Sequence, residues 1–246
     1  MRRRAFFPSV LAFLLLAPLS AEGSIARDTA GMLARADSFR LPDDSMKYLV
    51  TIVTSDKDRE TERDSFLVSS HGQRSLIEML SAKSRGQQVL VLNRQMWIKM
   101  PKSKRVIRIT PLQRLTGQAS FSDLARLKFD ADYRITASKD VLLGDRACVA
   151  LDLRALAKDE TYPAIALWVE AARGYPVKAD FFLPSGKRFK SLDFEPPERI
   201  GDREVTTKYA IRDDLHPDQV SSLSVSEIRL TALPDSLFSI SRLEGD

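Results

Sequence analysis

The stretch MWIKMPKSKRVIRI, residues 96–109, predicts two short strands joined by a polar turn. In its first half, Met96, Ile98 and Met100 alternate with Trp97 and Lys99. Successive side chains of an extended chain point to opposite faces, so the first three share one apolar face. The four residues PKSK then reverse the chain before a second run, RVIRI. The stretch therefore indicates an antiparallel hairpin.

The same period of two recurs along most of the chain. Residues 205–212, in which Val205, Thr207, Tyr209 and Ile211 alternate with polar side chains, are typical of an antiparallel strand with one face in water. Further strands are predicted at 46–53, 66–69, 76–80, 89–92, 133–135, 146–153, 165–170, 177–183, 188–194 and 222–230. Ten or so strands with few helices favour a strongly curved antiparallel sheet, because a flat sheet of that size needs both faces covered.

Two segments depart from this period. Residues 25–39 place Met32, Leu33, Ala36 and Phe39 on one face at helical spacing, which predicts an N-terminal amphipathic helix. Residues 111–129 contain Gly117 and read as a long loop with a helical turn. The predicted fold class is mainly β with helices: an incomplete, strongly curved antiparallel barrel with an N-terminal helix and a helical lid.

The first 21 residues have the pattern of a secretory signal. Three arginines follow Met1, an apolar run extends to Leu19, and the small residue Ala21 precedes Glu22. We expect a signal peptide at 1–21, a single β domain at 22–246 and a periplasmic location. An uncleaved N-terminal anchor is the alternative.

Charge and cysteine content limit the partners and the chemistry. The net charge falls from +5 to +2 when the three arginines of the signal are removed, so nothing points to nucleic acid. Cys148 is the single cysteine, so no intramolecular disulfide forms, and no lipid-attachment cysteine follows the apolar run. A buried thiol that packs as a small apolar group is the expected role of Cys148.

The usual catalytic signatures are absent from the sequence. His71 and His216 both lie in turn contexts, and no nucleophile elbow, zinc motif, paired cysteines or phosphate-binding loop is present. The aspartate pairs at 43–44 and 213–214 lack the spacing of a metal loop. We therefore expect no catalytic residue, no metal and no cofactor.

Two parts of the chain combine distinctive motifs. In the first, the strand that holds Trp97, the Pro-Lys turn and the basic strand lead into the GQASFSDL segment at 117–124. The second is a hairpin that comprises GYPVKA at 174–179 with Gly186, Lys187, Phe189 and Lys190. In these motifs the chain resembles the LolA-like group of outer-membrane lipoprotein-sorting proteins. The GQAS portion departs from the Gly-Ser loop of the group. The resemblance implies a curved half-barrel whose apolar hollow shelters the acyl chains of a lipid or lipoprotein.

Three sets of residues are candidates for this role. The candidate lining of the cavity is Met96, Trp97, Ile98, Met100, Val177 and Phe181, which ordinary core packing explains equally well. The candidate headgroup or partner contact is the basic cluster of Lys99, Lys102, Lys104, Arg105 and Arg108, for which a solvated hairpin is the simpler alternative. The candidate lid comprises Leu115, Gly117, Phe121 and Leu124.

These features predict a monomeric, non-enzymatic periplasmic carrier. It would bind lipoprotein or lipid acyl chains, encounter membranes at their surface and pass cargo between membrane-associated partners, one of which is an inner-membrane transporter by analogy with the group. One alternative is an envelope sensing module on the same fold. The other is an envelope lipid hydrolase, whose catalytic groups would have to converge only in three dimensions.

Overall fold

The computed structural model describes residues 29–40, 45–103, 105–125 and 128–245. Strands dominate it. The elements are α1 (Met32–Ser38), β1 (Met46–Asp56), β2 (Arg59–His71), β3 (Arg74–Met79), β4 (Gln88–Leu92), β5 (Gln95–Lys99), β6 (Val106–Ile109), β7 (Arg114–Thr116), β8 (Ala119–Ser120), α2 (Phe121–Ala125), α3 (Phe129–Asp132), β9 (Tyr133–Leu143), β10 (Arg146–Ala155), β11 (Ala164–Glu170), β12 (Pro176–Phe182), β13 (Arg188–Phe194), β14 (Glu198–Ile200), β15 (Arg203–Val205), β16 (Lys208–Asp213), β17 (Gln219–Leu230), η1 (Asp235–Phe238) and α4 (Ile240–Glu244).

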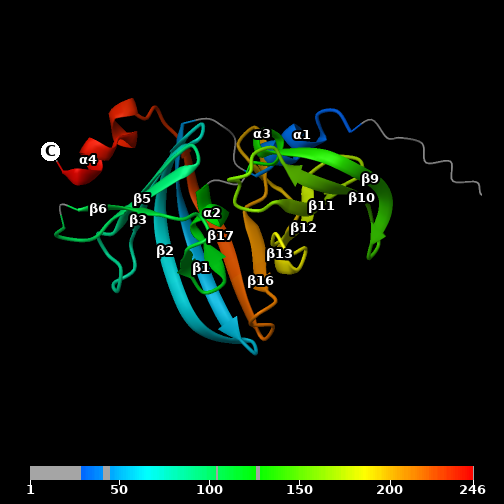
Figure 1. The fold of residues 1–246 in the computed structure, drawn as a ribbon, viewed down its shortest axis with the longest axis horizontal. Coiled ribbons are helices and arrows are strands. Elements are labelled where there is room, and N and C mark those ends of the chain that lie inside the picture. The colour runs from blue at the N-terminus through cyan, green and yellow to red at the C-terminus, as the bar shows by residue number, and fades with distance from the viewer. Residues whose placement is uncertain (1–28, 41–44, 104, 126–127, 246) are drawn as a thin grey trace, which may run out of the picture.

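Thirteen of the strands form one antiparallel sheet. Its order is β6-β5-β4-β3-β2-β1-β17-β16-β13-β12-β11-β10-β9, so β6 and β9 are its two edges and the sheet is not closed into a barrel. The long strands β1, β2 and β17 curve along their length (Figure 1). The mainly β, antiparallel fold class is thus confirmed.

One face of the sheet, here called the inner face, carries the main core. On β1, Met46, Tyr48, Val50 and Ile52 are each about 1% exposed, while the residues between them are more accessible. This alternation is what a pleated strand produces when one face is buried. The neighbours of β1, which are β2 and β17, add Phe66 and other apolar side chains to the same cluster.

Short helices cover the inner face. Leu33 and Ala36 of α1, Phe121 and Leu124 of α2, and Phe129 of α3 all belong to the main core. The opposite, outer face has a smaller cluster, in which η1 and α4 place Phe238 and Leu243 against the sheet. A third cluster surrounds Cys148, which is 1% exposed.

Several element boundaries differ from the sequence-based expectation. The N-terminal helix begins at Met32, because Gly31 takes a left-handed φ of 71°; residues 25–28 lie outside the described residues. The strand expected at 133–135 extends to Leu143 as the edge strand β9. The strand expected at 205–212 is split into β15 and β16, since Thr206 and Thr207 bond instead to Phe39 and Val225.

The segment expected to be a loop with a helical turn at 111–129 contains more regular structure. It forms the β7–β8 hairpin, followed by α2 and the start of α3. None of the helices in the described ranges is both long and apolar enough to cross a membrane. The expected signal at 1–21 lies outside those ranges.

The dependence of the fold on the main core is testable at Leu167 of β11, which is fully buried. Leu167→Ala should lower the free energy of unfolding by about 2–5 kcal/mol, because it removes apolar contacts and leaves a cavity. Leu142→Ala is the matched control, since Leu142 is 75% exposed. Urea denaturation of both variants measures the difference, and equal stabilities would contradict the assignment of this core.

Candidate functional site

Residues 111–125, here called the insert, pack against the inner face of the sheet. The insert consists of the β7–β8 hairpin and α2. Its apolar side chains complete the main core: Ala119, Phe121 and Leu124 are 1–4% exposed, and Leu115 packs against the same cluster. The insert thus occupies apolar surface that the sheet would otherwise leave uncovered.

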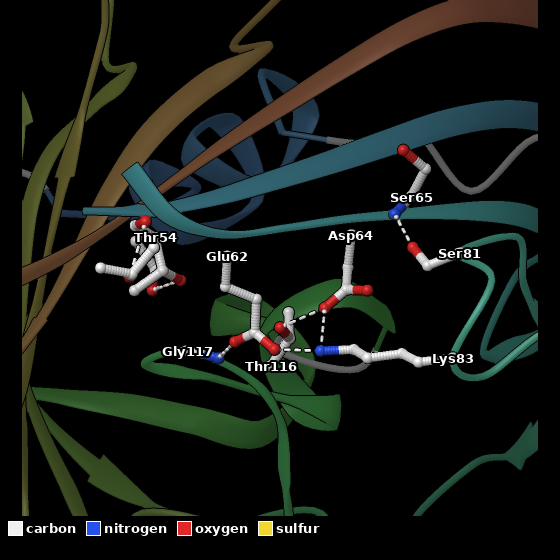
Figure 2. A network of polar contacts seen from close by, with 10 residues as sticks. Thr54, Glu62, Asp64, Ser65, Ser81, Lys83, Thr116 and Gly117 are labelled. Atoms are coloured by element: carbon white, nitrogen blue, oxygen red, sulfur yellow. Dashed lines mark hydrogen bonds and ion pairs between the residues drawn. The ribbon is translucent and has the colours of Figure 1, made fainter. Parts of the chain in front are cut away.

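The first anchor of the insert is a polar network at β2 (Figure 2). The Thr116 hydroxyl donates to Asp64 Oδ2 at 2.5 Å, and the Gly117 amide donates to Glu62 Oε2 at 3.1 Å. Lys83, from the loop between β3 and β4, donates to Glu62 and lies 3.2 Å from Asp64. Two carboxylates and one cation therefore tie the hairpin to the sheet.

This network keeps the carboxyl groups of Glu62 and Asp64 in their ionised form. The hydrogen bond from Lys83 holds the pKa of Glu62 below its usual range. Burial pushes the pKa of Asp64 upward, but hydrogen bonds from Thr116, Ser81 and Lys83 outweigh burial, so the pKa of Asp64 is also lowered. The anchor is consequently strongest where both carboxylates are charged.

Gly117 allows the hairpin to approach β1 and β17 closely. Its φ is 50°, a left-handed value that favours glycine, and an added Cβ would collide with the hydroxyls of Thr54 and Ser221. The next amide, that of Gln118, donates to Ser221 Oγ at 2.8 Å. Gly117, one of the candidate lid residues, is therefore a point of close packing in the structure.

The second anchor is an ion pair inside the main core. Lys190 of β13 is 1% exposed, and its Nζ lies 2.5 and 2.6 Å from the two carboxylate oxygens of Asp123 in α2. Asp123 also accepts hydrogen bonds from the amide and hydroxyl of Ser120. The Tyr209 hydroxyl of β16 donates to the Asp123 carbonyl at 2.9 Å. The insert is therefore tied to the sheet at its helix as well as its hairpin.

Lys190 is held in its charged form. Burial alone would lower the pKa of Lys190, but the Asp123 carboxylate beside it outweighs burial and raises that pKa. The rings of Tyr162 and Phe181 lie 5.2 and 5.6 Å from Nζ and add cation–π contacts. A protonated lysine accepts no proton, so its 3.3 Å contact with Ser120 Oγ does not make that serine a nucleophile.

One histidine contacts a serine, as the first two members of a Ser-His-carboxylate set would. Ser45 Oγ lies 2.5 Å from His71 Nδ1, but among the described residues no carboxylate bonds to the other ring nitrogen. His216 contacts Asp213 within a turn. Across the same ranges, no group of three or more His, Cys, Asp or Glu side chains has the arrangement of a metal site.

The structure divides the six candidate lining residues among different surroundings. Met96 and Phe181 lie fully buried in the main core, and Ile98 packs against it. Trp97 faces the outer side and packs with the η1–α4 cluster. Val177 joins the Cys148 cluster, because a β-bulge reverses its face relative to Phe181. Met100 follows the end of β5 and is 40% exposed.

The basic cluster surrounds the edge hairpin β5–β6. Lys102, Arg105 and Arg108 are exposed, Lys99 is half-buried, and Lys104 lies outside the described residues. Of the candidate lid residues, Leu115 and Gly117 belong to the hairpin of the insert, while Phe121 and Leu124 belong to α2. All four lid candidates are thus brought together.

Sequence reasoning missed the role of the anchoring charges. One signal was available: Lys190 shares its strand face with Leu192 and Phe194, which alternate as buried positions on β13. A lysine at an inward position requires a charged partner, and its identity depends on a contact across 67 positions of the sequence. Glu62 and Asp64 gave no comparable signal, since β2 has many exposed charges.

Comparisons with known proteins agree with this architecture. A family model described as "-like: Uncharacterized protein" matches residues 71–245. No curated protein matches the chain. A solved LolA superfamily protein from Nitrosomonas europaea is 31% identical, with a TM-score of 0.79, over 86% of this chain and 97% of the other.

Two more distant structures share the fold. An outer membrane lipoprotein-sorting protein domain from Vibrio parahaemolyticus is 16% identical, with a TM-score of 0.73, over 87% of this chain and 97% of that domain. A DUF1329 family protein from Desulfovibrio piger is 19% identical, with a TM-score of 0.69, over 86% and 96%. The identity and near-complete coverage of the Nitrosomonas protein, together with the open antiparallel sheet, show that this chain belongs to the LolA superfamily.

Proposed function

We propose that this protein is a periplasmic, non-enzymatic carrier that shelters the acyl chains of a lipoprotein or lipid against the inner face of its sheet. The observation that carries the proposal is the insert. It fills the apolar inner face with a short hairpin and one turn of helix, and polar contacts hold it at Asp64, Glu62 and Asp123. Movement of the insert would open apolar surface without disturbing the sheet ladder.

Burial energies make such an exchange feasible. Burying the side chains of Phe121 and Leu124 contributes roughly 1.5–3 kcal/mol each. Transfer of a dozen methylenes from water to an apolar site is favourable by about 10 kcal/mol of free energy, at about 0.8 kcal/mol per methylene. An acyl chain therefore offers more apolar burial than Phe121 and Leu124, the two largest apolar side chains that the insert buries.

The open edge at β6 is suited to the encounter with a membrane. Met100, Ile107 and Leu112 are large apolar residues that are 40–53% exposed near this edge. Exposed Lys102 and Arg105 lie in the same part of the chain. Apolar side chains beside cations favour the interface of an anionic bilayer. In this proposal the edge is where cargo enters, and residues 1–21 direct export.

Native mass spectrometry of the protein purified from its own envelope tests the carrier function. We expect a co-purifying acylated species that is released on unfolding, because the inner face would retain an acyl chain. A bare protein mass that persists after incubation with lipids and acylated peptides would contradict the proposal and favour a sensing module that binds a protein partner. Hydrolysis of those acyl substrates would favour the lipid hydrolase instead.

Movement of the insert is tested by fixing it in place. Gln118 Nε2 lies 2.7 Å from Gln219 Oε1 of β17, so cysteines at both positions accept a short bis-maleimide in a Cys148→Ala background. Cross-linking should reduce acyl-chain uptake at least tenfold, measured with a fluorescent fatty acid. The same variant without cross-linker is the matched control. Undiminished uptake after complete cross-linking would rule out the moving insert.

The buried ion pair is tested by a double-mutant cycle. Lys190→Met should destabilise the protein by about 3–5 kcal/mol, because it leaves the Asp123 charge buried without a partner. Adding Asp123→Leu to the same chain should recover most of that loss, since no buried charge then remains. Urea denaturation measures all the variants. A double variant as unstable as Lys190→Met would show that the pair is not coupled.

The Glu62–Asp64 anchor predicts a dependence on pH. Both carboxyl groups have lowered pKa values in the fold, so their stabilisation is present above the unfolded-state pKa of about 4. It is lost as the pH falls through the lower, folded-state values. The free energy of unfolding should therefore fall less between pH 6 and pH 3 in Glu62→Gln/Asp64→Asn than in the parent protein. Identical pH dependence would contradict the anchor, and Lys83→Met should also flatten the profile.

A further inference from the structure

A hollow on the outer face of the sheet is lined by three cations. It has a volume of about 500 Å³ and lies between the start of β1, the end of β17 and the C-terminal segment that contains η1 and α4. Lys47, Arg229 and Arg242 line it, together with the hydroxyl residues Thr231 and Ser236. In the described part of the chain, no carboxylate is among its lining residues.

Two of the cations are fixed in a like-charged pair. Lys47 and Arg229 are direct partners across the antiparallel β1–β17 ladder. Side chains at such positions share one face and lie close together, and like charges there repel each other. Lys47 points away from the main core, because its neighbours Met46 and Tyr48 are buried there. The ladder thus presents two positive charges side by side on the outer face.

The backbone beside this pair is irregular. The register shifts between Lys47 and Leu49, and Glu227 of β17 has a φ of 51°, which is unusual for a residue with a side chain. Bulges commonly redirect side chains next to functional sites. The register shift and the unusual φ of Glu227 thus lie beside the Lys47–Arg229 pair, within the paired strands and not at a turn.

Internal counter-charges do not neutralise the three cations. Arg229 lies 3.6 Å from Glu227, but their side chains are 76% and 63% exposed, so the attraction is screened by water. Lys47 and Arg242 have no ion-pair partner among the described residues. Asp235, which lies between the lining residues Pro234 and Ser236, is paired with Arg74 instead.

The geometry points to this hollow as a binding site for a phosphate group. Arginine pairs with phosphate through two parallel hydrogen bonds, and lysine and hydroxyl groups add further donors. Leu233 and Leu237 form an apolar wall beside the cations, which suits a phosphate ester with an apolar substituent. The site is on the opposite face from the insert, so it does not depend on the proposed carrier function.

Titration with glycerol 3-phosphate, followed by ¹H–¹⁵N NMR, tests the site. We expect saturable shifts of the backbone amides of Thr231, Ser236 and Leu237. Lys47→Gln/Arg229→Gln should weaken binding by roughly tenfold or more, because it removes charge-assisted hydrogen bonds. The matched control is Lys139→Gln/Lys158→Gln, which removes the same net charge from two exposed positions outside the hollow.

A second arm separates the two sources of the phosphate group. Vesicles of phosphatidylglycerol present it as a lipid headgroup, whereas glycerol 3-phosphate and inorganic phosphate present it in solution. If the protein binds the vesicles alone, and Lys47→Gln/Arg229→Gln loses this binding while the control keeps it, the ligand is the lipid headgroup. If the protein binds glycerol 3-phosphate or inorganic phosphate saturably, and the same double variant loses this binding, the ligand is a soluble phosphate compound. Absence of saturable binding in both arms, or equal binding by the variant and the control, would overturn the site.

Discussion

The apolar inner face of an open sheet must be covered, and most other features of this protein follow from that constraint. Thirteen strands bring Tyr48, Phe66, Leu167 and Phe181 to one side, with no closed barrel to enclose them. Helices α1 and α3 and the insert cover this face instead. The cover comes from elements with few residues, so each covering side chain has a large share in excluding water.

Polar anchors hold the insert where apolar contacts alone would not specify its position. Apolar burial is non-directional, whereas the bonds from Asp123 to Lys190 and from Asp64 to Thr116 fix a register. A buried ion pair contributes little net stability compared with an apolar pair, because both charges lose water. The pair instead raises the free energy of any state in which one of the two charges stays buried without its partner. The pair therefore specifies the position that the insert occupies in the structure.

The two faces of the sheet therefore differ in chemistry. The inner face has apolar side chains and buried charges that have partners of opposite charge, Lys190 with Asp123 and Asp64 with Lys83. The outer face places the like charges of Lys47 and Arg229 side by side at the start of the C-terminal segment. That segment covers a part of the outer face by packing Phe238 and Leu243 against Leu76 and Leu90. A single pleated strand supplies both environments, since alternate residues of β1 belong to opposite faces.

The sequence by itself determined the strand content and the antiparallel pairing of successive strands, because alternation and turn residues act over short distances. The superfamily was indicated by the resemblance of the motifs at 96–124 and 174–190 to the LolA-like group. The sequence also located the insert within residues 111–129 and the inward side of Met96. Only the tertiary structure decided that Lys190 meets Asp123, that Val177 and Phe181 lie in different clusters, and that Lys47 opposes Arg229. These outcomes depend on bulges and on contacts between distant strands, and a register shift of one residue reverses the face of every side chain that follows.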